Sequence, residues 1–169
     1  MNFNRRNGLI LRNSEHPDIL PIASNMRKAD VAEIKASHGY NPFEALEVGI
    51  RYSRICLTAE FKGTPIAMFG AVETPPFENG KNFLLGTAQI WMLGTPEVEK
   101  IWICFGLVSK KVITYLLQYY QKLFNYVDVR NEKSVKWLTW CGAKFHDAVP
   151  YGPENQLFRY FYFEREVKV

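Results

Sequence analysis

The stretch "NYVDVRNEKSVKWLTWCGAKF", residues 125–145, decides the fold because it joins two strands through a short helix. Its apolar start belongs to a strand predicted at 124–129. Asn131 is a good helix N-cap, Glu132 favours the positive end of a helix, and Gly142 suits the position just past a helix end. A further strand begins at the closing Ala-Lys-Phe. The stretch therefore predicts strand, short helix and strand in succession.

Further elements follow from the spacing of apolar residues. A step of three or four positions over 97–123 predicts one long helix with an apolar face. Runs of β-branched and aromatic residues predict strands at 55–61 and 66–72, which form a hairpin, and at 84–93. The last strand is predicted at 156–164. The stripe of the long helix consists of Val98, Ile101, Phe105, Val108, Val112, Leu116, Tyr119 and Leu123.

The first third of the chain is predicted to hold one strand and two helices. Residues 18–26 have the composition of a strand, and 27–39 that of a helix ended by a glycine. A second helix over 41–53 opens with a capping-box pattern and a proline at its first position. Residues 1–17 are expected to form a loose arm, and the Pro-rich loop 73–82 to be a mobile lid or contact surface.

Length and composition favour one domain spanning 1–169, an α/β fold built on a mixed sheet of six or seven strands with helices on both faces. The chain is 47% apolar and 15% aromatic, which supplies a substantial core. A net charge of +4 is too mild to indicate a nucleic-acid partner. No apolar run is long enough to span a membrane, and the N-terminus lacks a signal-peptide pattern, so we expect a cytosolic protein.

Cysteine and histidine usage gives no sign of a metal or a disulfide framework. The three cysteines are odd in number and far apart, which favours buried free thiols. The three histidines have no ligand spacing, so no metal is predicted. These six residues are Cys56, Cys104, Cys141, His16, His38 and His146.

The order of elements, with Asn131 opening the short last helix, resembles that of the GNAT superfamily of N-acetyltransferases. Asn131, Ser134 and Gly142 fit the pattern of the superfamily's last helix. Leu138 stands where that pattern has a tyrosine, and Ala143 where it has a phenylalanine. The early "MRKADVAEI" also resembles the Arg-x-x-Asp opening of the fold.

Several stretches bring the resemblance closer to GNAT-like internal virion proteins of T7-like tailed bacteriophages. They are "MRKADVAEIKAS", "KGTPIAMFGAV", "IWMLGT", the 125–145 stretch and the aromatic "FRYFYF". This resemblance implies a phage virion or host protein as partner. It also implies a location in the host-cell cytoplasm or the virion.

The superfamily resemblance implies acetyl-CoA as cofactor. In GNAT enzymes the sheet splays between two central strands, here 84–93 and 124–129, and acyl-CoA lies in the gap. A loop at the start of the long helix, here 94–104, receives the pyrophosphate. The implied cofactor-binding residues are Ile90, Trp91, Met92, Leu93, Gly94, Thr95 and Asn131, the last of which is explained equally well as a plain helix cap.

The sequence departs from the superfamily where the pyrophosphate would bind. Glu97 and Glu99 add negative charge, and Trp102 and Cys104 fall near the expected glycines. Like charges beside a phosphate cost about 1 kcal/mol or more each at intermediate dielectric. Leu138 also removes the usual proton donor to the departing thiolate. We therefore expect weak or absent acetyl-CoA binding.

Two classes of function follow. One is an acyl-CoA-dependent N-acetyltransferase in which Glu73, at a strand end, acts as general base. Exposed glutamates are, however, common at strand ends. The alternative is a non-catalytic protein that uses the GNAT scaffold in virion assembly or to bind a host factor, because a fold alone does not decide function.

Overall fold

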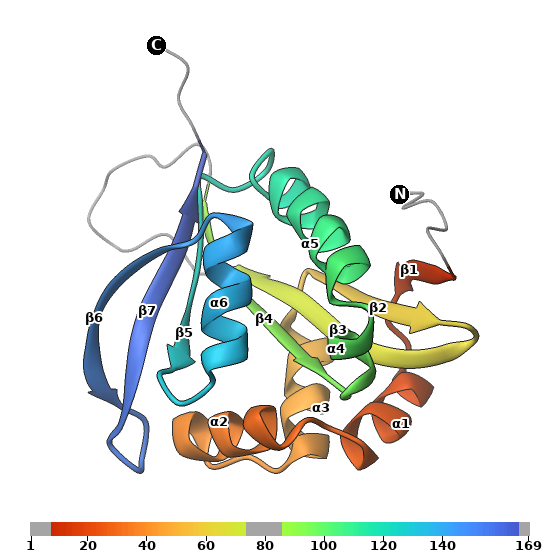
Figure 1. Ribbon diagram of the computed structural model, residues 1–169, viewed down its shortest axis with the longest axis horizontal. Helices are drawn as coiled ribbons and strands as arrows, with labels where there is room; N and C mark the ends of the chain where they lie inside the picture. Colours follow the sequence, from red (N-terminus) through yellow and green to blue (C-terminus); the bar gives the residue numbers. More distant parts are fainter. Residues whose placement is uncertain (1–7, 74–85, 166–169) are drawn as a thin grey trace.

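The protein was analysed as a computed structural model that describes residues 8–73 and 86–165 (Figure 1). Within these residues seven strands form one mixed sheet in the order β1-β2-β3-β4-β5-β7-β6. Neighbouring strands run antiparallel except β4 and β5, which are parallel. The strands are β1 Leu9–Asn13, β2 Ile55–Phe61, β3 Thr64–Glu73, β4 Thr87–Gly94, β5 Lys122–Asp128, β6 Lys144–Tyr151 and β7 Gln156–Glu164. The mixed sheet of six or seven strands predicted from the sequence is confirmed.

The sheet splays between β4 and β5. These strands pair only over Thr87–Gln89 and Lys122–Phe124, although β4 continues to Gly94 and β5 to Asp128. Beyond Gln89 the two strands diverge, and we call the space between them the β4–β5 gap. The splay predicted between 84–93 and 124–129 is therefore present.

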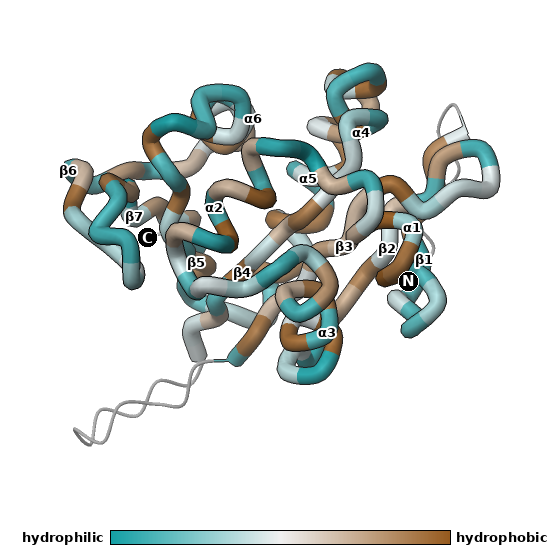
Figure 2. Tube along the Cα trace, turned by 90° about the horizontal axis from the view of Figure 1, so that it is seen from below, coloured by the Kyte–Doolittle hydropathy of each residue, from teal (hydrophilic) through white to brown (hydrophobic). Residues whose placement is uncertain are grey.

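Helices cover both faces of the sheet. α1 Ile19–Ser24, α2 Lys28–His38 and α3 Pro42–Tyr52 belong to one layer, and α5 Trp102–Leu116 and α6 Glu132–Cys141 to the other. Figure 2 shows α3 and α6 on opposite sides of the central strands. Figure 1 shows α2 crossing below the ends of β4 and β5, at the open end of the gap.

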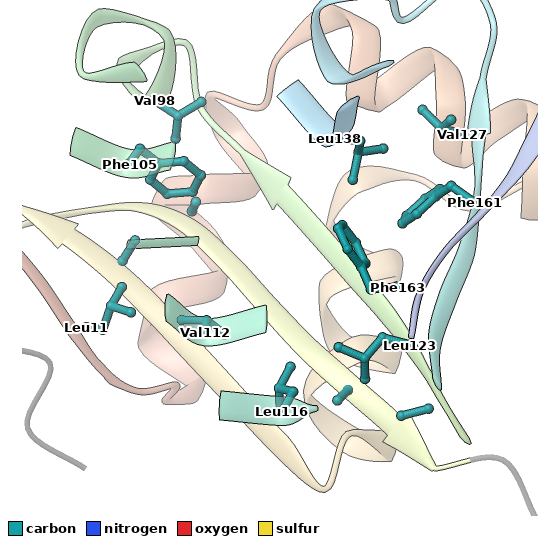
Figure 3. Packing of buried hydrophobic residues seen from close by; sticks show 14 of the residues in the cluster. Leu11, Val98, Phe105, Val112, Leu116, Leu123, Val127, Leu138, Phe161 and Phe163 are labelled. Atoms are coloured by element: carbon teal, nitrogen blue, oxygen red, sulfur yellow. The ribbon is translucent and has the colours of Figure 1, made fainter. Parts of the chain in front are cut away.

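Alternate residues of the central strands feed two hydrophobic clusters, because successive side chains of a strand point to opposite faces. Ala67 and Ala71 of β3 belong to the cluster that includes residues of α5 and α6. Figure 3 shows Phe105 and Val112 of α5 and Leu138 of α6 within this cluster. Met68 of β3 and Leu93 of β4 pack instead with Leu46 of α3 and its neighbours. The gap thus lies between two cores and is accessible to side chains from both layers.

The local helix signals read from the sequence are confirmed. In α3 the Asn41 Oδ1 accepts a hydrogen bond from the Glu44 amide at 3.0 Å, and Glu44 Oε2 accepts one from the Asn41 amide at 2.9 Å. In α6 the Asn131 Oδ1 accepts from the Ser134 amide at 3.3 Å. Gly142 follows the helix with φ 98°, a left-handed conformation that favours glycine.

The strand predicted at 18–26 is wrong. Residues His16–Asp18 form a 3-10 turn, η1, and α1 follows it. Ile19 and Ile22 are three positions apart, and both are buried against α3 and β3. A short apolar run is compatible with a strand, but a spacing of three between apolar residues is also compatible with a helix. Tertiary packing decided between the two structures.

The loose arm predicted for 1–17 is also wrong over its described part. β1 pairs with β2, and its Leu9 and Leu11 are buried. The Arg12 guanidinium bonds Asp18 at 2.6 Å and Glu60 at 3.0 Å, so this arginine is not simply solvated. Residues 9–13 lie on the sheet because β1 supplies apolar side chains to the core and pairs with the edge of β2.

The single long helix predicted over 97–123 is broken. A short helix, α4 Glu97–Lys100, stops at Ile101, which leaves helical geometry with φ −115° and ψ 27°, and α5 ends at Leu116. Strand β5 begins at Lys122, where a helix was expected. Tyr120, in the connection between α5 and β5, is buried and its hydroxyl donates to Glu73. Most of the loop predicted at 73–82 lies outside the described residues.

Candidate functional site

A cavity of about 410 Å³ occupies the β4–β5 gap. Both strands line it, β4 through residues 89–93 and β5 through 125–127. On the α5 and α6 side its wall includes Val112 and Ser134, and on the α2 and α3 side it includes Ile34 and Gly49. The cavity therefore reaches both layers of the fold, so two ligands could meet in it from opposite sides.

The backbone of β4 presents hydrogen-bonding groups to the gap. The Ile90 carbonyl accepts from Asn125 Nδ2 on β5 at 2.7 Å, and the Gly94 amide donates to Asp30 Oδ2 at 3.0 Å. Backbone groups of alternate residues in a strand point to the same side, so those of Met92, between Ile90 and Gly94, also face the gap. Strand geometry thus directs the Met92 amide and carbonyl toward any ligand in the cavity.

The side chains of the predicted β4 segment divide between the two layers. Ile90 and Met92 pack toward α5 and α6. Trp91 and Leu93 pack toward α2 and α3, and the Trp91 indole donates to Ser53 Oγ at 2.8 Å. All four line the cavity. They supply its apolar walls, while the polar contacts of the strand come from its backbone.

The predicted phosphate donors at the end of β4 are already engaged. Besides the Gly94 amide bound to Asp30, the Thr95 amide donates to the Ile66 carbonyl at 2.8 Å. The Thr95 hydroxyl is buried and has no partner among the described residues. Neither Gly94 nor Thr95 lines the cavity, in contrast to Ile90, Trp91, Met92 and Leu93.

The acidic residues of α4 are each paired with a lysine. Glu97 accepts from Lys100 at 2.5 Å, and Glu99 accepts from Lys133 of α6 at 2.5 Å. Glu99 also lies 3.9 Å from the Arg27 guanidinium. These cations offset the negative charge of Glu97 and Glu99. The two glutamates should therefore repel a diphosphate less than the sequence alone predicts.

Glu33 of α2 is a site residue that sequence reasoning missed. Its Oε2 accepts a hydrogen bond from Asn131 Nδ2 at 2.8 Å, and it lines the cavity. Burial, with a smaller contribution from the carboxylates of Asp30 and Asp128, raises the pKa of Glu33 to about 8 despite the hydrogen bond from Asn131. Such a carboxyl group can exchange a proton near neutral pH.

Asn131, predicted both as a helix cap and as a cofactor contact, has both ends of its amide engaged by the protein. Its oxygen caps α6, and its nitrogen holds Glu33. Asn131 is 5% exposed and lines the cavity. The structure thus assigns it a capping and positioning role, and a direct cofactor contact stays a prediction.

Glu73, the general base predicted from the sequence, lies away from this cluster. It pairs in register with Ala88, at the closed end of the β4–β5 pair, and does not line the cavity. Its carboxylate is 3.2 Å from Arg54 Nε and accepts from the Tyr120 hydroxyl at 3.0 Å. Burial and this hydrogen bond raise the pKa of Tyr120 to about 12. A catalytic role for Glu73 stays a prediction.

An aromatic wall lines the cavity beside α2. Its side chains form a continuous series of ring contacts. The rings of Tyr40 and His38 stack with centroids 5.7 Å apart, His38 meets Tyr151 edge to face at 6.4 Å, and Tyr151 stacks on Tyr126 at 4.2 Å. Gly152 holds Tyr151 in place, because the β6–β7 turn approaches α2 so closely that a Cβ there would lie 2.2 Å from the Ala36 carbonyl oxygen. We call these four aromatic residues the aromatic wall.

The described residues contain no group of three or more His, Cys, Asp or Glu placed to hold a metal ion. Across the same described ranges, no helix combines the length and apolarity that a membrane crossing requires.

No family model matches the chain, and no curated protein matches its sequence. Solved structures match its fold. A spermidine N-acetyltransferase from Vibrio cholerae in complex with CoA and spermine aligns with a TM-score of 0.65 and 16% identity, over 94% of this chain and 96% of that one. An acetyltransferase of the GNAT family from Bacillus anthracis aligns at 0.65 and 12%, over 97% and 98%.

A ribosomal-protein-alanine N-acetyltransferase from Brucella melitensis aligns at 0.62 and 12% identity, over 92% of this chain and 99% of that one. At these identities the likeness concerns the fold alone. The class is therefore that of the GNAT fold, a seven-stranded mixed sheet opened between its parallel central strands. The resemblance to this fold predicted from the sequence is confirmed.

Proposed function

We propose that this protein transfers an acetyl group from acetyl-CoA to an amine. The observation that carries the proposal is the cavity in the β4–β5 gap, toward which the Met92 backbone groups are directed. The spermidine N-acetyltransferase that shares the fold was solved with CoA bound, which supports acetyl-CoA as the ligand. The cavity also reaches both layers, as a reaction between a cofactor and a separate acceptor requires.

The acyl arm of acetyl-CoA would lie along β4 on the side of α5 and α6. There the Met92 amide is a donor for the arm or for the thioester oxygen, which gains negative charge as an amine attacks. The start of α5 offers positive charge for the diphosphate, while Lys100 and Lys133 offset the charge of Glu97 and Glu99. Because Gly94 and Thr95 amides are engaged, we expect most of the affinity to come from the acyl arm.

The test is binding and turnover of acetyl-CoA, with a matched pair of variants. Ser109 and Thr114 of α5 both donate their hydroxyls to the carbonyl four residues earlier, but only Ser109 lines the cavity. Acetyl-CoA at a hundred times its dissociation constant should stabilise the wild type by about 2.7 kcal/mol, and thiol release should appear with an amine present. Ser109→Trp should abolish the shift in melting temperature and Thr114→Trp should keep it. No shift in the wild type refutes the proposal.

A second candidate function is that of a non-catalytic protein on the GNAT scaffold. It is favoured by the engaged amides of Gly94 and Thr95 and by the buried apolar Leu138, which stands where the superfamily has its proton donor. The sequence resemblance to GNAT-like proteins of tailed phages then supports a role in the virion or toward a host protein, in the host-cell cytoplasm or the particle. Absence of acetyl-CoA binding together with co-purification of the chain with phage particles supports this candidate.

A further inference from the structure

The α2 side of the cavity combines the Glu33 carboxyl group with the aromatic wall. Glu33 and the wall residues His38, Tyr126 and Tyr151 all line the same cavity, across the β4–β5 gap from α5. Glu33 reaches from α2 to Asn131 at the start of α6, so it stands at the open end of the gap. A molecule that enters from this side meets the aromatic rings and the carboxyl group together.

Glu33 differs from the acidic residues around it because they have cationic partners. Asp30, on the same helix, is bonded by the Arg27 guanidinium at 2.7 Å, and Asp128 at the end of β5 by that of Arg130 at 2.6 Å. Among the described residues no arginine, lysine or histidine forms an ion pair with Glu33. Burial also lowers the pKa of His38, the histidine of the wall, which keeps it neutral near pH 7. The cavity therefore offers one carboxylate for a cation.

We propose that the acceptor is a compound with a single primary amine on an apolar or aromatic body, and that Glu33 binds this amine and takes its proton. This proposal rests on the acetyl-transfer function proposed above. The aromatic wall would hold the body of the acceptor by stacking and by contact with its ammonium group. Asn131 is a positioning residue, because it touches Glu33.

Proton transfer to Glu33 precedes acyl transfer. The ammonium form of the acceptor gives one proton to the ionised Glu33 carboxylate and becomes a neutral amine. Its nitrogen attacks the thioester carbonyl carbon, so that a C–N bond forms and, on collapse, the C–S bond breaks. The second nitrogen proton passes to the departing thiolate, directly or through water, which yields the amide and CoA thiol. Glu33 then returns its proton to solvent.

The charges of the cavity argue against a polyamine. Several separated ammonium groups need several free carboxylates, whereas Asp30 and Asp128 are already neutralised by Arg27 and Arg130. Spermidine is therefore the discriminating comparison, since the fold is shared with a spermidine N-acetyltransferase. The pKa of Glu33, raised to about 8, supports its role, because the acceptor must lose a proton near this pH.

The experiment measures thiol release from acetyl-CoA with 2-phenylethylamine and with spermidine, for the wild type, Glu33→Gln and Glu47→Gln. Glu47 is the control, a half-buried carboxylate of α3 that does not line the cavity and lies 3.3 Å from His16. We expect 2-phenylethylamine to be the better acceptor, kcat to fall about 100-fold or more in Glu33→Gln, and the rise of kcat with pH near 8 to vanish with it. Glu47→Gln should behave as the wild type. Preference for spermidine, or full activity of Glu33→Gln, overturns the proposal.

Calorimetric titration of 2-phenylethylamine in the absence of acetyl-CoA tests the acceptor site separately from the proposed acetyl transfer. Tyr126→Leu should weaken its binding, and Tyr119→Leu, which changes an exposed tyrosine of another surface, should not. Amine binding that needs Glu33 and Tyr126, in a protein that does not bind acetyl-CoA, keeps the amine site and refutes acetyl transfer. Acetyl-CoA binding without amine binding keeps the proposed function and refutes the acceptor site.

Discussion

The side-chain amide of Asn131 donates to the Glu33 carboxyl group across 98 positions of the sequence, at 2.8 Å. The same asparagine caps α6 with its oxygen. One residue thus joins the start of the last helix to α2 at the open end of the β4–β5 gap. The stability of α6 and the geometry of the candidate site are therefore coupled through Asn131.

Substitution of Asn131 tests this coupling. Asn131→Ala removes the cap and leaves Glu33 without its donor, so we expect a loss of about 1 kcal/mol or more in the free energy of unfolding. Asn131→Ser retains an oxygen that can cap, and should restore most of the stability. Neither variant can donate to Glu33 as asparagine does, so both should show lower activity with 2-phenylethylamine than the wild type. Urea unfolding of both variants checks the first expectation, and equal stability of Ala and Ser variants would contradict it.

Glu33→Gln should change how stability depends on pH. The pKa of Glu33 is raised from 4.5 to about 8 in the folded protein, so between these values the folded state holds a proton that the unfolded state has lost. This lowers the stability of the wild type as pH rises through that window, after which the effect is constant. Glutamine keeps the acceptor for Asn131 and carries no charge.

We therefore expect Glu33→Gln to gain stability relative to the wild type on going from about pH 5 to about pH 9, by up to a few kcal/mol. Urea unfolding of both proteins at the two pH values measures the difference. Since Asp30 and the other titratable groups are common to both proteins, their contributions largely cancel. A stability difference that does not change with pH would show that Glu33 titrates in the folded protein as it does in the unfolded chain.

Gly49→Ala should destabilise the α3 layer. A Cβ at Gly49 would lie 2.5 Å from Cζ2 of Trp91, whose indole is held by Ser53. Overpacking of this kind costs about 1–3 kcal/mol, which exceeds the gain of nearly 1 kcal/mol in helix propensity. Gly86→Ala is the control, because its Cβ would meet nothing within 4 Å. Thermal unfolding should show a lower midpoint for Gly49→Ala alone.

Glu99→Gln should strengthen acetyl-CoA binding. The change releases Lys133 and removes a charge near Arg27, which makes the start of α5 more attractive to a diphosphate. Glu132→Gln is the control, because Glu132 is exposed and 3.7 Å from Lys136. S-acetylpantetheine, which has no phosphate, should bind both variants and the wild type alike. Equal gains for both ligands would place the diphosphate elsewhere.

Local elements of the fold could be read from the sequence because their causes are local. The caps at Asn41 and Asn131 depend on an amide three positions away, and both were predicted. The strand hairpin at β2 and β3 was likewise predicted. Other predictions failed. The apolar run that holds Ile19 and Ile22 is compatible with a strand and with a helix, and the break at Ile101 leaves no trace in the apolar periodicity of the predicted helix.

By itself, the sequence determined the helix caps, the β2–β3 hairpin and most of the strands, since these follow from propensity and from the period of apolar residues. The opening between β4 and β5 was implied by the resemblance to the GNAT superfamily. Only the tertiary structure decided which groups of the gap are available. It engages the Gly94 amide with Asp30, directs Met92 into the cavity, and carries Glu33 to Asn131. Hydrogen-bond partners and burial join residues far apart in the chain, and the raised pKa of Glu33 arises from such contacts.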